Sequence, residues 1–304
     1  IECCFVVFIL FFHLWQIDLA QPLAPQGPFD AICSQAEEVC LLWLLSTYVS
    51  THPSTVLLDP LPAMTRLLDR FASYRIMSKL HNSLRDWRIC SPPYLEVHRA
   101  SDLPSIQQAV MAQGLSFPLI CKTRVAHGSL SHEMSLIFSA GSLADIHPPC
   151  VLQSFVNHGA VLHKVFCVGD KHFCVERPSL KNFPPVPVVN RKTIFFNSHQ
   201  VSKPESSSDL TSNPFPVGES TSQSSAVSGP DLRVQLGMAL FGVDVIINIH
   251  THTLTVIDIN IFPGYEGVPQ FFSSLLNHIE SVLDKQTSTT SSLKTTTGGP
   301  PAGL

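Results

Sequence analysis

The chain has 304 residues, of which 44% are hydrophobic and 14% are charged, and its formal net charge is −4 at pH 7. This length allows two modest domains, and the apolar fraction supports a sizeable core. The charge balance gives no support to a nucleic-acid-binding function, which requires a basic face. The charges are also unevenly placed, because residues 1–65 contain no lysine or arginine but six acids.

The nine cysteines lie in apolar surroundings, and no two of them form a C-x-x-C pair. This usage disfavours a zinc ribbon or a dithiol redox motif. Buried, reduced thiols are typical of a cytosolic protein. We therefore expect a cytoplasmic location.

The chain starts with an unbroken apolar run at residues 3–12. The run is shorter than the roughly 18 apolar residues of a membrane-spanning helix. It also lacks the basic leader and the small-residue cleavage site of a signal peptide. We expect a buried or misplaced segment here, with a membrane or targeting element as the alternative.

A regular spacing of apolar residues begins after Asp59-Pro60, a pair that can open a helix. Apolar residues follow at helical spacing up to Leu84, with a break expected near Ser73, and residues 102–114 predict a further helix. Four strands are predicted next, at residues 117–122, 151–155, 161–168 and 173–176.

Two later segments lack the composition of a core. Residues 203–232 contain nine serines with several prolines and glycines, which predicts a flexible loop. A helix over residues 269–283 is expected to close the fold, with a disordered tail at residues 286–304.

Acids inside a predicted hairpin give the strongest chemical signal. Its strands, residues 240–248 and 253–261, contain Asp244, Asp258 and Asn260. Asp258 and Asn260 share one face of their strand, and a suitable register brings Asp244 to the same face. Two carboxylates roughly 5 Å apart would repel by about 3 kcal/mol at an effective dielectric near 20. A magnesium ion shared with nucleotide phosphates would remove that repulsion; the alternative is a pair of solvated acids on an edge hairpin.

Two lysines at strand positions supply the cations that a magnesium–nucleotide site needs. Lys122 ends one apolar strand and Lys164 lies within another. Either lysine alone is more typical of a surface position, and a phosphate-binding Lys122 would be dispensable for folding. The chain has no P-loop or dinucleotide-binding glycine motif.

Six sequence runs in a fixed order carry the most specific pattern, at residues 58–62, 88–93, 121–128, 177–183, 195–199 and 258–267. They resemble the inositol-tetrakisphosphate 1-kinase family, also called inositol-trisphosphate 5/6-kinases, of the ATP-grasp superfamily. The resemblance covers about residues 55–204 and 241–283.

The resemblance implies an α+β ATP-grasp fold that holds the nucleotide between two antiparallel sheets. It divides the chain into a divergent and incomplete N-terminal α/β substrate domain at residues 1–58 and a kinase domain at residues 59–285. The implied activity is ATP- and Mg²⁺-dependent transfer of the γ-phosphoryl group to a hydroxyl of an inositol polyphosphate, by a monomer. Two alternatives are an ATP-binding protein of this fold without kinase activity and an ATP-grasp carboxylate–amine ligase.

The resemblance also implies roles for individual residues. The nucleotide would contact Arg88, Lys122, Gln153, Ser154, Phe155, Val156, Lys164, Ser179, Ser198 and Ser202. One magnesium ion would bind Asp244 and Asp258, and a second would bind Asp258 and Asn260. The inositol phosphate would face His132, Lys164, Arg177, Asn260 and Gly264. Lys164 and Asp258 would be the catalytic residues.

The departures from the family pattern lie where the substrate should bind. A lysine-rich loop near the start of the family has no counterpart here, and Ser34-Gln35 stands where the family has a His-Lys pair. The serine-rich segment replaces most of an expected amphipathic helix. Because a polyphosphate needs cations, we expect inositol polyphosphate binding to be weak and turnover to be slow.

Overall fold

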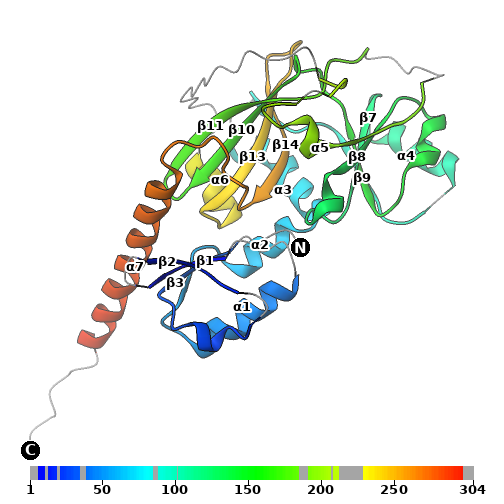
Figure 1. Cartoon of the computed structure of the whole chain (residues 1–304). Helices are drawn as coiled ribbons and strands as arrows, with labels where there is room; N and C mark the ends of the chain where they lie inside the picture. Colours follow the sequence, from blue (N-terminus) through cyan, green and yellow to red (C-terminus); the bar gives the residue numbers. More distant parts are fainter. Residues whose placement is uncertain are drawn as a thin grey trace, which may run out of the picture.

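The computed structural model describes residues 6–10, 13–18, 21–34, 39–84, 88–100, 102–184, 191–206, 208–211 and 229–296. In these ranges the strands form one four-stranded sheet, in the order β2-β1-β3-β4, and two five-stranded sheets. The five-stranded sheets have the orders β11-β10-β13-β14-β5 and β12-β8-β7-β9-β6. Figure 1 shows these two sheets beside each other, with the four-stranded sheet below them.

The N-terminal sheet contains β1 (Val6–Leu10), β2 (His13–Gln16), β3 (Ala31–Ser34) and β4 (Val56–Leu57), and helix α1 (Val39–Thr51) lies beside it (Figure 1). Residues 6–10 of the initial apolar run therefore form an inner strand, and the rest of that run lies outside the described residues. In the described part of the chain no helix is both long and apolar enough to cross a membrane. Buried side chains of Phe29, Ile32 and Leu45 join the main core.

Helices α2 (Leu61–Leu67) and α3 (Arg70–Leu84) confirm the helical pattern, but the prediction of a break near Ser73 is wrong. The break occurs at Asp69, which forms a β-bridge with Val125 and accepts a hydrogen bond from the Phe71 backbone N at 3.0 Å. The N-cap of α2 is Pro60 rather than Asp59. The Asp59 carboxylate instead accepts hydrogen bonds from the backbone N atoms of Ala239 and Leu240, at 2.6 and 3.2 Å.

The first five-stranded sheet is formed by β5 (Ile89–Cys90), β10 (Val161–Val168), β11 (Lys171–Pro178), β13 (Leu240–Ile247) and β14 (Leu254–Ile261). The predicted strands at 161–168 and 173–176 and the later hairpin are confirmed. Phe241, Val243 and Val256 are fully buried in its core, against α2 and α3.

The second five-stranded sheet is formed by β6 (Tyr94–Val97), β7 (Leu119–Thr123), β8 (Glu133–Ile137), β9 (Cys150–Ser154) and β12 (Ile194–Asn197). Helix α4 (Leu103–Ala112) confirms the helix predicted at residues 102–114, and its N-cap Asp102 accepts from the Ser105 backbone N at 2.8 Å. Val110 of α4 packs with Leu119 and Leu152 of the sheet.

The remaining elements are α5 (Ser198–Val201), α6 (Gly229–Leu236), α7 (Phe271–Thr296) and the short 3-10 helices η1 (Ala24–Gln26), η2 (Ser129–His132) and η3 (Gly141–Asp145). Helix α6 begins inside the serine-rich segment, of which residue 207 and residues 212–228 lie outside the described residues. Helix α7 extends well past Leu283, so the expected tail is helical up to Thr296. The Thr287 and Ser288 hydroxyls donate to carbonyls of the preceding turn, which accommodates polar residues in the helix.

Candidate active site

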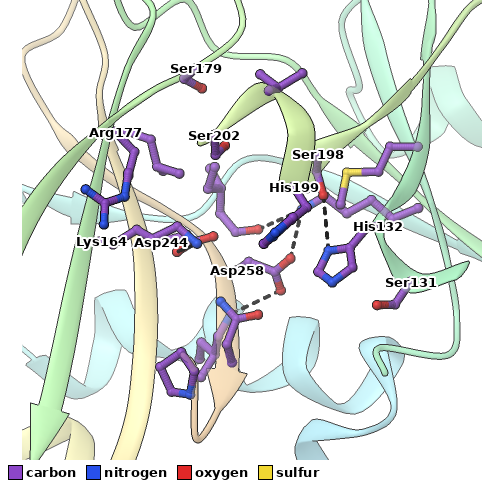
Figure 2. Close-up of a pocket in the computed structure, with 18 of the residues that line it drawn as sticks. Ser131, His132, Lys164, Arg177, Ser179, Ser198, His199, Ser202, Asp244 and Asp258 are labelled. Carbon is purple, nitrogen blue, oxygen red and sulfur yellow. Dashed lines mark hydrogen bonds and ion pairs between the residues drawn. The ribbon is translucent and has the colours of Figure 1, made fainter. Parts of the chain in front are cut away.

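A cavity of about 430 Å³ lies between the two five-stranded sheets. Its lining contains every predicted site residue except Arg88. These residues are Lys122, His132, Gln153, Ser154, Phe155, Val156, Lys164, Arg177, Ser179, Ser198, Ser202, Asp244, Asp258, Asn260 and Gly264. Figure 2 shows how the labelled members of this set converge from both sheets.

The two hairpin aspartates face each other across the β13–β14 pair. Asp244 is the register partner of Asp258, and Gly242 is the partner of Asn260, so the register required for a shared site is present. A β-bulge follows, because Val245 pairs with Val256 and Ile257 is left without a register partner. Bulges are frequent beside active sites, where they change the direction of backbone groups.

Lys122 reaches the hairpin from the opposite sheet. Its Nζ atom lies 3.0 Å from the carbonyl O of Ile257, the extra residue of the bulge, and 3.4 Å from Asp258 Oδ2. Nζ also lies 5.4 Å from the ring centroid of Tyr74 in α3. Lys122 is only 4% exposed, so its ammonium group is compensated by protein groups rather than by water.

The charges of this cluster shift its pKa values in different directions. Burial would raise the pKa of Asp258, but the charges of Lys122 and Arg70 outweigh burial and lower it below its usual value. Burial opposes the charged form of Lys122, yet the Asp258 carboxylate raises the lysine pKa above its usual value. The pKa of Asp244 is raised, mainly by burial, and the nearby Lys164 only partly offsets that effect.

A second lysine stands beside Asp244. Lys164 on β10 is the register partner of Asp244, and its Nζ atom lies 4.0 Å from Asp244 Oδ1. Its side chain is 30% exposed, so it faces the open cavity more than Lys122 does. The two lysines therefore flank the aspartates from different sheets and strands.

The segment after β14 brings Gly264 to the cavity. Phe262 and Tyr265 have positive φ angles of 28° and 50°, a conformation that costs free energy in residues with side chains. The Tyr265 hydroxyl holds the segment by donating to the Cys167 carbonyl at 3.0 Å. Arg177 donates to the carbonyl of Glu266 at 2.7 Å, so the predicted substrate arginine is tied to this same segment.

The side of the cavity near α5 carries histidines. His132 ends η2, and its Nδ1 atom lies 3.5 Å from the Ser198 hydroxyl at the start of α5. The ring centroids of His132 and His199 lie 5.5 Å apart, and both side chains are seen in Figure 2. Both histidines are exposed, which leaves them accessible to a ligand in the cavity.

The end of β9 and the loop after it supply polar groups at the inner wall. Gln153 is 2% exposed, and its Oε1 accepts a hydrogen bond from Tyr74 at 2.6 Å. Among the described residues, Gln153 Nε2 is one of the few buried side-chain donors that have no partner. A buried donor in a cavity wall is suited to a polar ligand. The Ser154 hydroxyl is used differently, because it accepts from the Ser116 backbone N at 3.0 Å.

Arg88 is the one predicted site residue that the structure does not bring into the cavity lining. It is exposed at the turn before β5, where its carbonyl accepts from the Leu254 backbone N at 2.7 Å. Leu254 begins β14, so Asp258 lies about 13 Å further along that strand at the usual rise per residue. A nucleotide-binding role for Arg88 stays a prediction.

Sequence reasoning missed several residues of the cavity, and Arg70 is the most important of them. Arg70 is 4% exposed and donates to backbone carbonyls of Thr123, Val125 and Ser131, which holds the loop between Lys122 and His132. The only sequence signal for Arg70 was its place within the apolar helical pattern that extends to Leu84. His158 and His199 also line the cavity and were missed; His199 ends the run at residues 195–199, but no role was assigned to it.

The donor set of the hairpin fits a hard divalent cation. Asp244, Asp258 and Asn260 offer only oxygen ligands on this face, and the described residues contain no group of three or more His, Cys, Asp or Glu side chains able to hold a metal ion. Two carboxylates and one amide leave coordination positions for ligand oxygens, as in sites that share magnesium with phosphates. In the absence of a metal, the lysines provide the compensating charge.

Comparison with known proteins gives concordant results. A family model described as the inositol 1,3,4-trisphosphate 5/6-kinase ATP-grasp domain matches residues 83–281, and the model of the pre-ATP-grasp domain of these kinases matches residues 11–64. An inositol-tetrakisphosphate 1-kinase from Danio rerio is 50% identical over 286 residues, which cover 89% of this chain and 72% of that protein. Its counterpart from Xenopus laevis is 47% identical over 285 residues, with the same coverage of 89% and 72%.

Among solved structures, the D-alanine–D-alanine ligase from Coxiella burnetii superposes with a TM-score of 0.53, covering 95% of this chain and 77% of the ligase. The sequence identity is 11%, so this likeness concerns the fold alone.

Proposed function

The chain belongs to the inositol 1,3,4-trisphosphate 5/6-kinase family, and from this membership we propose that it transfers the γ-phosphoryl group of ATP to a hydroxyl of an inositol polyphosphate in the cavity between its five-stranded sheets. The family and the ATP-grasp fold predicted from the sequence are confirmed. The observation that carries the proposal is the convergence of Lys122 and Lys164 on Asp244 and Asp258.

ATP would lie between the sheets, with its adenine near the end of β9 and its phosphates near the lysines. Gln153 Nε2 supports this placement, because it is an unpaired buried donor in the wall. Phe155, Val156, Ser179, Ser198 and Ser202 would complete the nucleotide contacts, and all of them line the cavity.

Family membership implies a divalent metal, and we propose that it is Mg²⁺ and that two ions bind. Asp244 and Asp258 would hold one ion, and Asp258 and Asn260 the other. A metal in this position would neutralise phosphate charge and align the transferring group. The raised pKa of Asp244 supports the assignment, because a buried carboxylate with too little compensating charge gains from a nearby cation.

The inositol polyphosphate would lie on the open side, between His132, Lys164, Arg177, Asn260 and Gly264. Lys164 and Arg177 would donate to phosphate oxygens, and Arg177 is held in place by the Glu266 carbonyl. Lys164 would also contact the transferring phosphoryl group, because it stands beside the metal ligand Asp244. The contribution of these residues to catalysis is positioning and charge neutralisation, the main requirements of phosphoryl transfer.

We also propose that the protein is a monomer that acts in the cytoplasm, as its cysteines suggest. Six cysteines, at positions 33, 90, 121, 150, 167 and 174, are free, and all of these except Cys90 are buried. The division into a substrate domain at residues 1–58 and a kinase domain at residues 59–285 remains part of this proposal, with β4 and Asp59 at the boundary.

A radiolabelled transfer assay tests the proposed function against its alternatives. The chain is incubated with γ-labelled ATP, Mg²⁺ and inositol tris- or tetrakisphosphates, and labelled products are separated by anion exchange. We expect label in an inositol phosphate with one phosphate more than the substrate. ATP binding without any labelled product would favour a non-catalytic binding protein. A hydroxylamine-sensitive acyl phosphate formed with a carboxylate substrate would favour a ligase.

A further inference from the structure

A buried histidine in the cavity wall determines the direction of a hydrogen bond made by a predicted nucleotide-binding serine. His158, which is 6% exposed, lies in the loop between β9 and β10. Its Nδ1 atom lies 2.7 Å from the carbonyl O of Val156, and its Nε2 atom lies 2.8 Å from Ser179 Oγ. Both residues bonded to the ring line the cavity, and Figure 2 shows Ser179 on its wall.

The backbone around this histidine is fixed by further hydrogen bonds. Asn157 Nδ2 donates to the Phe183 carbonyl at 2.8 Å, and the Phe183 backbone N donates back to Asn157 Oδ1 at 2.9 Å. Asn182 Oδ1 accepts from the backbone N atoms of His158 and Gly159, at 3.1 and 3.0 Å. The loop and the segment after β11 therefore form one unit, and the imidazole ring is held between Val156 and Ser179.

The position of each proton in this chain of hydrogen bonds follows from the chemistry of the groups. A carbonyl oxygen can only accept, so His158 Nδ1 carries a hydrogen. Burial is the main influence that lowers the pKa of His158, which keeps the ring neutral with a single N–H. Nε2 is then an acceptor, and the Ser179 hydroxyl must donate its only hydrogen to it.

We propose that His158 is a positioning residue that makes Ser179 an obligate hydrogen-bond acceptor toward the cavity. Ser179 would therefore select a nucleotide that presents a donor at this point, which is either the exocyclic amine of adenine or a ribose hydroxyl. A ligand without that donor leaves a buried lone pair unsatisfied, and sites of this kind discriminate strongly. The inference rests on the proposed nucleotide site and adds to it the polarity of one contact.

Binding measurements without an acceptor substrate separate this contact from catalysis. Titration calorimetry in the presence of Mg²⁺ compares ATP with ITP, in which a carbonyl replaces the amine, and with 2′-deoxy-ATP and 3′-deoxy-ATP. We expect Ser179→Ala to weaken ATP binding about 3- to 10-fold, the usual effect of one neutral hydrogen bond. Ser179→Ala should not weaken the binding of the one analogue that lacks the donor. That analogue then shows whether the donor is the amine or a ribose hydroxyl.

Three further variants sharpen the result. Ser139→Ala is the matched control. Ser139 and Ser179 are each 8% exposed and hydrogen-bonded, but Ser139, whose partner is Ser142, lies outside the cavity lining. This control variant should leave all four affinities unchanged. Ser179→Thr keeps the hydroxyl and should keep the wild-type preference for ATP over the analogue that lacks the donor. His158→Phe should reduce this preference for ATP, because the Ser179 hydroxyl then rotates freely and can donate. Circular dichroism checks that the variant folds.

Two results would overturn the inference. The first is an equal effect of Ser179→Ala on ATP and all three analogues, and the second is loss of the preference in a folded Ser179→Thr variant. A wild-type chain that binds no magnesium–nucleotide would reject the proposed function as well. A chain that binds ATP without any dependence on Ser179 would reject only the present inference.

Discussion

The cavity between the five-stranded sheets and the N-terminal region differ most clearly in their positive charges. In the cavity, Lys122 and Lys164 stand beside aspartates, and Arg70 and Arg177 are anchored on backbone carbonyls. Residues 1–65 contain no lysine or arginine, although the pre-ATP-grasp family model matches residues 11–64. The nucleotide half of the site thus has its countercharges, whereas the N-terminal region can offer a polyphosphate only neutral donors and repelling acids. The following predictions test this contrast, from the largest expected effect to the smallest.

Removing the carboxylate shared by both proposed metal sites should have the largest effect. We expect Asp258→Ala to lower phosphoryl transfer by about 10³-fold or more, because metal and phosphate charge would no longer be balanced. Asp244→Ala should leave measurable activity, because only one proposed ion loses a ligand. The transfer assay with labelled ATP measures both rates. Near-normal activity of the Asp258 variant would contradict the assignment of the hairpin.

Supplying cations to the N-terminal region should strengthen substrate binding. We expect a chimaera that carries the corresponding N-terminal residues of the Danio rerio relative in place of residues 1–50 to bind inositol polyphosphate about 10²- to 10⁴-fold more tightly. This range corresponds to two charge-assisted hydrogen bonds of about 1.5 to 3 kcal/mol each. ATP affinity, measured on the same chimaera by calorimetry, serves as the control and should not change. Tight binding and fast turnover by the unaltered chain would show that these cations are not required.

Lys122→Met should affect nucleotide binding and also stability. We expect ATP affinity to fall about 10- to 100-fold, through loss of a charge-assisted phosphate contact. The sequence predicts a lysine that is dispensable for folding, but its burial against Asp258 changes that expectation. Breaking a buried ion pair leaves an uncompensated charge, at a cost of about 3 kcal/mol in unfolding free energy. Urea titration of the ligand-free variant measures this cost, and the exposed Lys171→Met is the matched control.

The pH dependence of stability should report on Asp59, which connects the segment before α2 to the start of β13. Burial raises the pKa of this carboxyl to about 6, despite the two backbone N–H groups that bind it. The unfolded chain releases the proton near the usual aspartate pKa of 3.8, so the folded state holds more protons between these two pKa values. The unfolding free energy should therefore fall by up to about 3 kcal/mol as pH rises from about 4 to about 6.

Asp59→Asn should remove this contribution from the pH profile, whatever its effect on absolute stability. Asp102→Asn provides a control of opposite sign, because hydrogen bonding to Ser105 lowers the pKa of that exposed N-cap carboxyl. Its contribution is present at higher pH and is lost as pH falls through the lowered pKa. Identical pH slopes for wild type and Asp59→Asn would contradict the prediction.

The sequence predicted local features well and long-range ones poorly. Two apolar stretches located the β13–β14 hairpin, and the acids within it indicated the metal site that we propose. Asp59 was misjudged because its partners, Ala239 and Leu240, are far away in sequence, and a local capping rule does not consider them. The break at Asp69 was misplaced for the same reason, since it depends on a bridge to Val125.

The family resemblance identified many of the polar residues that line the cavity, but not the residues that hold it in shape. Arg70 acts through buried hydrogen bonds to three carbonyls of a distant loop, which periodicity cannot reveal. The bulge at Ile257 is equally hidden, because an unbroken apolar strand gives no sign of an extra residue. Arg88 shows the opposite case, in which a motif residue lies outside the cavity lining.

The bulge carbonyl that accepts from Lys122 belongs to the protein backbone, so its position does not depend on a side-chain rotamer. If Asp258 turns to the proposed cation, the ammonium group would lose one partner, while the Ile257 carbonyl, 3.0 Å away, would remain available to it. This backbone contact would therefore help to keep the ammonium group at the same point of the cavity when ligands bind. Part of the electrostatic preorganisation of the proposed site would then come from the backbone, which holds the positive charge in place before the substrate arrives.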